Sequence, residues 1–294
     1  MAAYTTIDDP TAYFQVELYT GTGSSNARTF DSDTTMQPDL VWIKERSGTE
    51  SPHLSTSVQG ATYYLQSNTV GAEGTAAEGL KSFDSDGFTV GTQDQVNTNT
   101  ETYVAWCWKA GTTSGITTNG STTITPSTYS FNQTAGISII EYTGNGTAGA
   151  KVAHGLGAVP QVFVGKIVTP YTGDDWTTFH HILGNTKNIP WNATNAAGTA
   201  TTRWNDTSPD SVNMTLGTDS SVNQNTGTQI AYVWTGIQGF SKFGSYTGNG
   251  NADGAFVYTG FRPAWVMIKR TDSTNDWVMY DNKREGYNVD NDYL

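Results

Sequence analysis

The sequence predicts an all-β protein made of tandem antiparallel β-sandwich units, two complete and one partial. Two observations lead to this fold class. Glycine accounts for 32 of the 294 residues, aromatic residues for 12% and charged residues for only 14%, a composition typical of strands joined by short polar turns. The string Tyr-Thr-Gly-Asn-Gly occurs at 142–146 and 246–250, with the near copy Tyr-Thr-Gly-Thr-Gly at 19–23. Asn-Gly favours tight turns, so each copy is expected to be a turn.

The repeated turn is followed each time by a proline and an apolar run that ends in lysine. The distance from the first glycine of the turn to that proline is 17 residues for Gly21, 16 for Gly144 and 15 for Gly248. Because the intervening sequences differ, this spacing predicts one supersecondary unit used three times. Arrays of repeated units form stalks and binding surfaces more often than a catalytic cleft.

The first unit is expected at residues 13–109, after an N-terminal arm at residues 1–12. The arm has neither the basic start nor the apolar core of a secretory signal, so no signal is expected. No apolar run approaches the ~20 residues that a membrane-spanning helix needs, so no membrane insertion is expected. The strands of this unit are predicted at 14–19, 40–44, 62–65, 87–91 and 103–108.

The second unit is expected at residues 136–238 and repeats the order of the first. Phe88 and Ala105 in the first unit are 17 residues apart, as are their counterparts Met214 and Ala231 in the second. Equal spacing between distant apolar segments supports a common unit over its whole length.

Two regions are expected to depart from complete units. Residues 110–135 are rich in Thr, Ser, Asn and Gly, which predicts a polar linker or a short hairpin of 123–125 with 129–131. Residues 239–294 form the partial third unit, with an opening strand and turn but no counterpart of the two closing strands. A β unit without its closing strands has unpaired backbone edges and an apolar face that is exposed to solvent. We therefore expect either a natural chain that continues beyond Leu294 or completion by another chain.

Charge and cysteine content narrow the functional classes. The formal net charge is −12, and the 15 Lys and Arg residues form no basic run, so no nucleic acid partner is expected. Cys107 is the single cysteine, which excludes an internal disulfide. It lies in an apolar run, which favours a buried structural thiol over an intermolecular disulfide or a nucleophile.

No catalytic residue, cofactor or metal site is expected from the motifs present, and an enzyme is not expected. His180 and His181 are adjacent, so on a strand they point to opposite faces and cannot share a metal without a bend. The segment 84–87, Asp-Ser-Asp-Gly, resembles the start of a calcium loop but lacks the later glutamate, which favours a plain turn. Gly155-Leu156-Gly157 precedes a proline and a strand rather than a helix, so phosphate binding is not expected.

Three tryptophans are the candidate ligand-binding residues. Trp176, Trp191 and Trp204 lie beside Asp, Asn and Thr rather than inside apolar runs. Sugar-binding surfaces combine an aromatic face with amides or carboxylates in this way, so these rings are a hypothetical glycan site. The alternative is that they pack at sandwich edges or between units. Trp277, which follows its Pro-to-Lys strand at a spacing similar to that of Trp176, favours packing.

Several strings resemble repeats in virion proteins of marine tailed bacteriophages. They include Tyr-Thr-Thr-Ile-Asp-Asp-Pro at 4–10, Phe-Ser-Lys-Phe-Gly-Ser-Tyr at 240–246 and Pro-Ala-Trp-Val at 263–266. Those proteins are labelled as tail fibres or as a domain of unknown function with a lectin-like sandwich fold. The resemblance covers nearly the whole chain and implies jelly-roll or lectin-like sandwiches, without catalytic residues to transfer.

The resemblance implies a non-enzymatic structural virion protein, in a tail fibre or related appendage that contacts a host surface glycan. Its expected partners are copies of itself, as a homotrimer, and other virion proteins. A capsid decoration or head fibre protein, a carbohydrate-binding adhesin and a polysaccharide-degrading enzyme are the alternatives.

Overall fold

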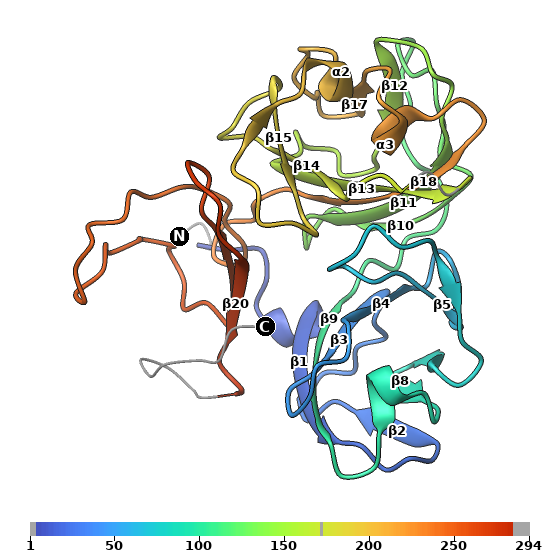
Figure 1. Cartoon of the computed structure of the whole chain (residues 1–294), viewed down its shortest axis with the longest axis vertical. Helices are drawn as coiled ribbons and strands as arrows, with labels where there is room; N and C mark the ends of the chain where they lie inside the picture. Colours follow the sequence, from blue (N-terminus) through green and yellow to red (C-terminus); the bar gives the residue numbers. More distant parts are fainter. Residues whose placement is uncertain (1–3, 171–172, 285–294) are drawn as a thin grey trace.

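The computed structural model describes residues 4–170 and 173–284, and its regular structure is mostly antiparallel β (Figure 1). This confirms the predicted all-β sandwich class. The helices in the described residues are single turns: η1 (Pro10–Ala12), α1 (Asp94–Asn97), α2 (Thr201–Trp204) and α3 (Ser220–Asn223). None of the helices in these two ranges is long and apolar enough to span a membrane.

The first unit contains a main sheet with strand order β1-β9-β3-β4 and a second sheet with order β2-β8-β7. Alternate side chains of the main sheet, such as Val41 and Ile43, meet Phe88 and Val90 of the second sheet in the first sandwich core. Cys107 is buried in this core, as predicted. The strands are β1 (Phe14–Thr20), β2 (Asn26–Thr29), β3 (Leu40–Glu45), β4 (His53–Thr56), β7 (Leu80–Asp84), β8 (Gly87–Val90) and β9 (Thr102–Trp108), with a small pair β5 (Tyr63–Tyr64) and β6 (Gly74–Thr75).

The second unit has a seven-stranded main sheet, β10-β11-β18-β13-β14-β15-β16, and a two-stranded second sheet, β12-β17. Phe163 and Val233 of the main sheet meet Val152 and Met214 of the second sheet in the second sandwich core. The strands are β10 (Thr128–Asn132), β11 (Ile137–Thr143), β12 (Ala150–Ala153), β13 (Val162–Thr169), β14 (Thr177–His180), β15 (Lys187–Pro190), β16 (Gly198–Thr199), β17 (Asn213–Leu216) and β18 (Thr228–Trp234).

The two units match in strand order and in individual hydrogen bonds. The order β1-β9-β3-β4 corresponds to β11-β18-β13-β14, and the pair β2-β8 corresponds to β12-β17. The Tyr19 hydroxyl donates to the Val96 carbonyl at 2.7 Å, and the Tyr142 hydroxyl donates to the Val222 carbonyl at 2.8 Å. Each tyrosine belongs to the repeated turn, which explains why both turn sequences are alike.

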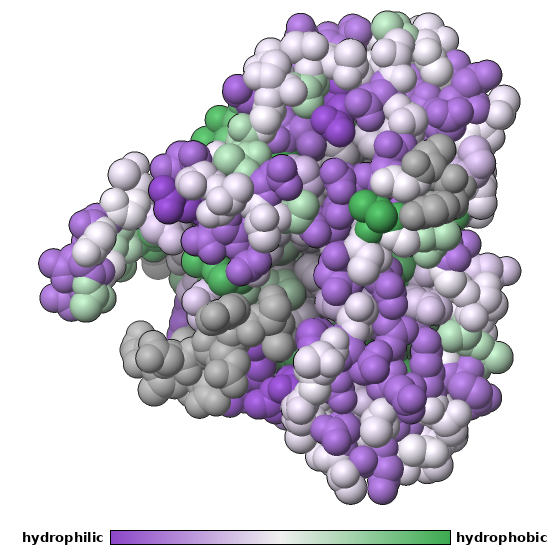
Figure 2. All heavy atoms as spheres, viewed as in Figure 1, coloured by the Kyte–Doolittle hydropathy of each residue, from purple (hydrophilic) through white to green (hydrophobic). Residues whose placement is uncertain are grey.

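The outer faces of the two main sheets form a third apolar cluster, the central core. Leu40, Trp42 and Trp106 of the first unit share it with Ile139 and Tyr232 of the second. Each main sheet is therefore buried on both faces, and the units pack through these faces rather than standing in a row. The face shown in Figure 2 is mostly hydrophilic over both units, and its hydrophobic residues form small patches.

The segment 110–135 belongs to the second unit and is neither a free linker nor the predicted hairpin. Tyr129 of β10 is opposite Ile140 of β11, whereas Ile124 forms a bridge to Val152 of β12. The two predicted hairpin arms thus pair with different strands. The apolar side chains that suggested a hairpin instead extend both layers of the second sandwich.

The third copy contributes one hairpin in the described residues. It consists of β19 (Trp265–Lys269) and β20 (Trp277–Asp281), and its side chains Trp265, Met267 and Met279 pack against the central core. The predicted opening strand near 240–246 has no regular structure. In the complete units the opening strand pairs with the closing strand, and the third copy lacks such a partner in residues 239–284. The prediction about Leu294 lies outside the described residues.

Candidate functional site

The structure buries all three tryptophans of the glycan hypothesis. Trp176 and Trp204 have no exposed surface, and Trp191 is 8% exposed. Trp176 and Trp191 lie in the central core with their ring centroids 5.4 Å apart, and the Trp176 indole donates to the Gln66 carbonyl of the first unit at 3.1 Å. The expected glycan site at these residues is thus corrected, because neither ring has a face open to a sugar.

Trp204 lies in the second sandwich core. Its ring stands edge-on between Phe163 and Phe179, at centroid distances of 5.7 and 5.8 Å, and its indole donates to the Lys187 carbonyl. The packing alternative therefore describes all three rings.

The polar neighbours that suggested a sugar site build loops instead. The Asn192 side chain accepts from the Trp176 backbone N–H at 2.8 Å and donates to Asp175 at 2.9 Å. These groups fix the strand ends around a buried indole. Polar residues beside a tryptophan thus indicated a loop connection, not an exposed ring.

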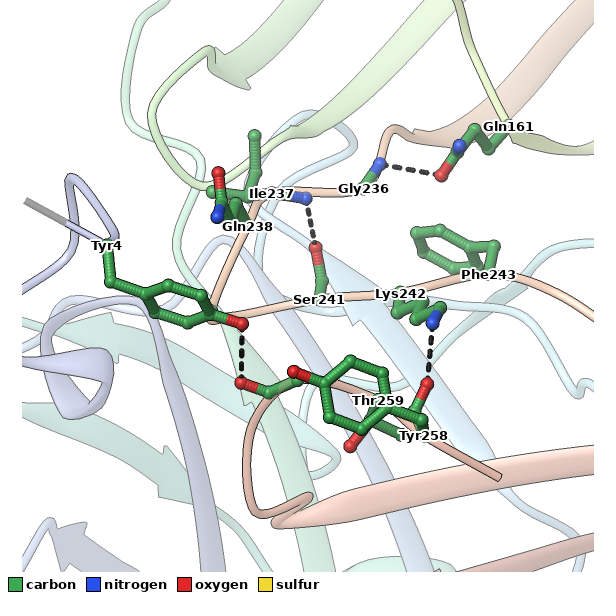
Figure 3. Close-up of a pocket in the computed structure, with 12 residues that line it drawn as sticks. Tyr4, Gln161, Gly236, Ile237, Gln238, Ser241, Lys242, Phe243, Tyr258 and Thr259 are labelled. Carbon is green, nitrogen blue, oxygen red and sulfur yellow. Dashed lines mark hydrogen bonds between the residues drawn. The ribbon is translucent and has the colours of Figure 1, made fainter. Parts of the chain in front are cut away.

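A shallow pocket of about 280 Å³ lies where the N-terminal arm meets the start of the third copy (Figure 3). Its lining comes from Tyr4, from Gln161 just before β13, from the connection 236–243 and from residues 258–260. The string at 240–246 pointed only to a family resemblance and did not predict this pocket. No local motif marks it, because its walls are far apart in the sequence.

The polar side chains of the pocket are tied to backbone groups. The Tyr4 hydroxyl donates to the Gly260 carbonyl at 2.8 Å, and Lys242 Nζ donates to the Tyr258 carbonyl at 2.5 Å. Gln161 accepts from the Gly236 N–H at 2.9 Å. Desolvation, followed by its hydrogen bond to Tyr258, raises the pKa of Tyr4. The lining contains no carboxylate, imidazole or thiol, and its titratable side chains are Tyr4, Tyr258 and Lys242.

His53 and His154 are buried, His180 is half-buried, and all three contribute to the fold. Burial lowers the pKa of His53 to about 3, and burial lowers the pKa of His154 and His180 to about 4, so these rings are neutral near pH 7. His154 accepts from the Leu156 N–H and contacts the Asp210 carbonyl at 3.1 Å, which positions the Gly-Leu-Gly turn. Within residues 4–170 and 173–284, no group of three or more His, Cys, Asp or Glu side chains is placed to hold a metal ion.

The candidate calcium loop at 84–87 and the single cysteine also have structural roles. Asp84 accepts from Ser82 and Thr89 in the β7–β8 turn, and Asp86 accepts from the Met36 N–H. Burial raises the pKa of the Cys107 thiol well above its usual value, which disfavours a nucleophilic thiolate.

Two buried carboxylates join parts of the chain that are far apart in sequence. Asp39, after the first turn, accepts from the Ala110 N–H and from Ser130 of β10. Asp281 of β20 pairs with Arg284 at 2.6 Å and accepts from the Trp106 indole at 3.2 Å. These contacts hold the second unit and the β19–β20 hairpin against the first unit.

The family model described as a domain of unknown function (DUF7483) matches residues 9–294. The chain belongs to this family. Membership in DUF7483 assigns no activity. No curated protein matches the chain. The crystal structure of the STIV MCP is similar at 9% identity and a TM-score of 0.17, over 75% of this chain and 84% of that chain, and a likeness at that score carries no argument here.

Proposed function

We propose that this chain is a non-enzymatic structural protein of a tailed-bacteriophage virion, in a tail fibre or a related appendage. The central core is the observation that carries the structural role. It buries the outer faces of both main sheets and includes the β19–β20 hairpin. A large apolar contact of this kind restrains relative motion between units, as a stiff appendage needs.

The disposition of reactive side chains supports the same role. His53, His154 and Cys107 are buried, and the pocket residues are engaged with backbone carbonyls and N–H groups. The side chains that often perform chemistry thus contribute to packing and loop structure.

The virion part of the proposal is supported by the resemblance of residues 4–10 and 240–246 to repeats of phage virion proteins. The proposed function includes assembly of this chain as a homotrimer and contact with other virion proteins. Contact with host glycan would have to use exposed side chains, and Tyr4 and Tyr258 beside the pocket are 54% and 67% exposed.

Labelling of purified particles tests the location. Antibody-bound gold should mark the tail of particles from a phage that encodes this chain, and the protein should remain after the particles are washed. Gold on the head would instead favour the capsid decoration alternative, and loss of the protein on washing would contradict both.

Two solution measurements test the rest of the proposal. Light scattering should give three times the mass of one chain, and a monomer would contradict the homotrimer. Host surface polysaccharide should keep its length after incubation with the protein, and shortened chains would overturn the non-enzymatic assignment.

A further inference from the structure

The chain contains three Asn-Gly pairs, at 119–120, 145–146 and 249–250. In such a pair the backbone nitrogen of the glycine can attack the asparagine side chain, because glycine has no side chain to obstruct the approach. The second and third pairs lie in the identical string Tyr-Thr-Gly-Asn-Gly. A difference in reactivity between these two pairs therefore reports on their surroundings.

The two identical turns also share their local geometry. Gly146 and Gly250 have the same left-handed backbone, with φ of +66° and +67°. In each turn the asparagine side chain accepts from the N–H group two residues later, at 2.9 Å in the second unit and 3.1 Å in the third copy. Attack by the glycine nitrogen thus starts from the same arrangement in both turns.

In the second unit, the attacking nitrogen is covered by residues 217–234, which lead into and include β18 and which we call the closing segment. The Gly146 N–H donates to the Asn223 carbonyl at 3.1 Å and contacts the Asn223 side-chain oxygen at 3.3 Å. The Asn145 N–H donates to the same side chain at 2.8 Å. Because Asn223 is fully buried, these bonds break only when the closing segment opens locally.

In the third copy, the same nitrogen is open to water. Within residues 4–170 and 173–284, the Gly250 N–H has no hydrogen-bond partner, and a Cβ atom on Gly250 would meet no atom within 4 Å. Every residue from 244 to 258 is exposed. The Asn249 amide donates to the Asp253 carbonyl at 2.7 Å, a bond inside this exposed segment. Ring closure at Asn249 therefore disturbs exposed groups, whereas ring closure at Asn145 requires a buried one to move.

The remaining pair is exposed, but its side chain is tied to a buried residue. The Asn119 side-chain oxygen accepts from the Ser121 N–H at 3.0 Å and from the Asn213 amide at 3.2 Å. Asn213 is fully buried and accepts in turn from Thr122 at 2.7 Å. The carbon that would be attacked is thus held in place, so Asn119 should react more slowly than Asn249.

We propose that Asn249 is a site of spontaneous covalent modification, in which its amide is converted to a carboxylate. The Gly250 nitrogen loses its proton and bonds to Cγ of Asn249, the bond from Cγ to Nδ2 breaks, and Nδ2 leaves as ammonia. One water molecule then adds to either carbonyl carbon of the five-membered imide and opens the ring. The product is aspartate or isoaspartate, and it carries one additional negative charge at neutral pH.

The modification alters a turn whose neighbourhood in the sequence has little charge. Asp253 is the only charged residue between positions 245 and 259. Tyr246 and Phe256 on either side of the turn are 52% and 90% exposed. The new carboxylate doubles the charge of this segment, and isoaspartate also adds a methylene group to the main chain. Both changes fall outside the two sandwich cores.

Peptide mapping of the full chain tests the proposal. The folded protein is incubated at neutral pH, and mass spectrometry follows the conversion of amide to acid at each Asn-Gly pair, with an isoaspartate-specific methyltransferase as a second detector. Conversion at Asn249 should be at least about tenfold faster than at Asn145, because reaction at Asn145 requires local opening. In urea, where the closing segment no longer covers Gly146, the two rates should become similar.

Two variants separate the effect of the cover from that of the local sequence. Asn223→Ala removes the bonds to the turn at 145–146, so conversion at Asn145 should accelerate while conversion at Asn249 stays unchanged. Asn249→Gln lengthens the side chain by one methylene group, which disfavours the five-membered ring, and should remove the fast conversion. The comparison in urea uses the wild-type chain, so it does not depend on how well either variant folds.

Three results would overturn the proposal. The first is an equal rate at Asn145 and Asn249 in the folded chain. The second is faster conversion at Asn119 than at Asn249. The third is a difference between the two identical strings that persists in urea, since the closing segment could not then be its cause.

Discussion

Residues 142–146 and 246–250 have the same sequence but lie in different surroundings. In the second unit the turn follows β11, and its tyrosine is fully buried. In the third copy the turn has the same left-handed glycine, yet the residues before it form no strand and its tyrosine is exposed. The turn conformation is therefore encoded locally, whereas the strand requires a neighbour to pair with.

In each complete unit, the segment that lies beside the turn supplies an asparagine side chain that bonds to it. Asn223 is fully buried, and its amide bonds the turn on one side and the Gly217 carbonyl on the other. Asn97 has the same role in the first unit, where it accepts from the Thr22 N–H and donates to the Gly91 carbonyl. One asparagine per complete unit thus joins the turn to the closing segment.

Replacement of this asparagine should give the largest effect. Asn223→Ala leaves the Gly217 carbonyl buried without its partner and removes the bonds to the turn, so the free energy of unfolding should fall by about 3 kcal/mol. Urea unfolding monitored by tryptophan fluorescence measures this loss. Asn249→Ala, in the exposed third turn, should stay within about 0.5 kcal/mol of wild type. Similar losses for both variants would contradict the distinction between the two turns.

Histidine protonation at low pH should destabilise the complete units but not the third copy, because residues 239–294 contain no histidine. The pKa of His154 is lowered to about 4 in the folded chain, so the unfolded chain takes up a proton first as the pH falls below about 6.5. Stability should therefore decrease between about pH 6.5 and 4, by about 2.5 kcal/mol at pH 4.5 from this group.

The His154→Gln variant isolates that contribution. Urea unfolding at about pH 7 and about pH 4.5 should show a smaller acid-induced loss for the variant than for wild type. The same loss in both proteins would mean that His154 titrates normally in the folded state.

Alanine substitution of the turn glycines should change the free energy of unfolding least, and it compares the second and third turns directly. Gly144→Ala forces a Cβ against the Gln224 carbonyl and should lower the free energy of unfolding by about 2 kcal/mol. Gly248→Ala meets no atom and should change it by less than about 0.5 kcal/mol. Differential scanning calorimetry of the two variants provides the check, and a destabilised Gly248→Ala chain would show that the third turn is already covered.

The sequence was a good guide to the fold wherever local patterns decide the structure. The all-β class followed from composition, the turn from its repeated string, and the strands that contain Val41 and Val104 from continuous apolar runs. The segment 110–135 was misjudged, because its pairing with β11 and β12 is decided by strands that come later in the chain.

The candidate site was much less predictable. Polar neighbours made Trp176 and Trp204 look exposed, but burial of a large ring depends on sheets that meet only in three dimensions. The Val-Asn pairs at 96–97 and 222–223 were a usable signal, since both precede the closing strand by the same number of residues. Their importance becomes clear only when the asparagine contacts are known.

The shared central core has a practical consequence for anyone who prepares shorter versions of this protein. Trp42 and Trp106 of one half lie against Ile139 and Tyr232 of the other, so a truncation near residue 111 would expose aromatic surface on both products. Such fragments should aggregate during purification even if the sandwich core of each one remains folded. Expression boundaries are better placed outside residues 13–281, so that both sheets keep each other and the β19–β20 hairpin as cover.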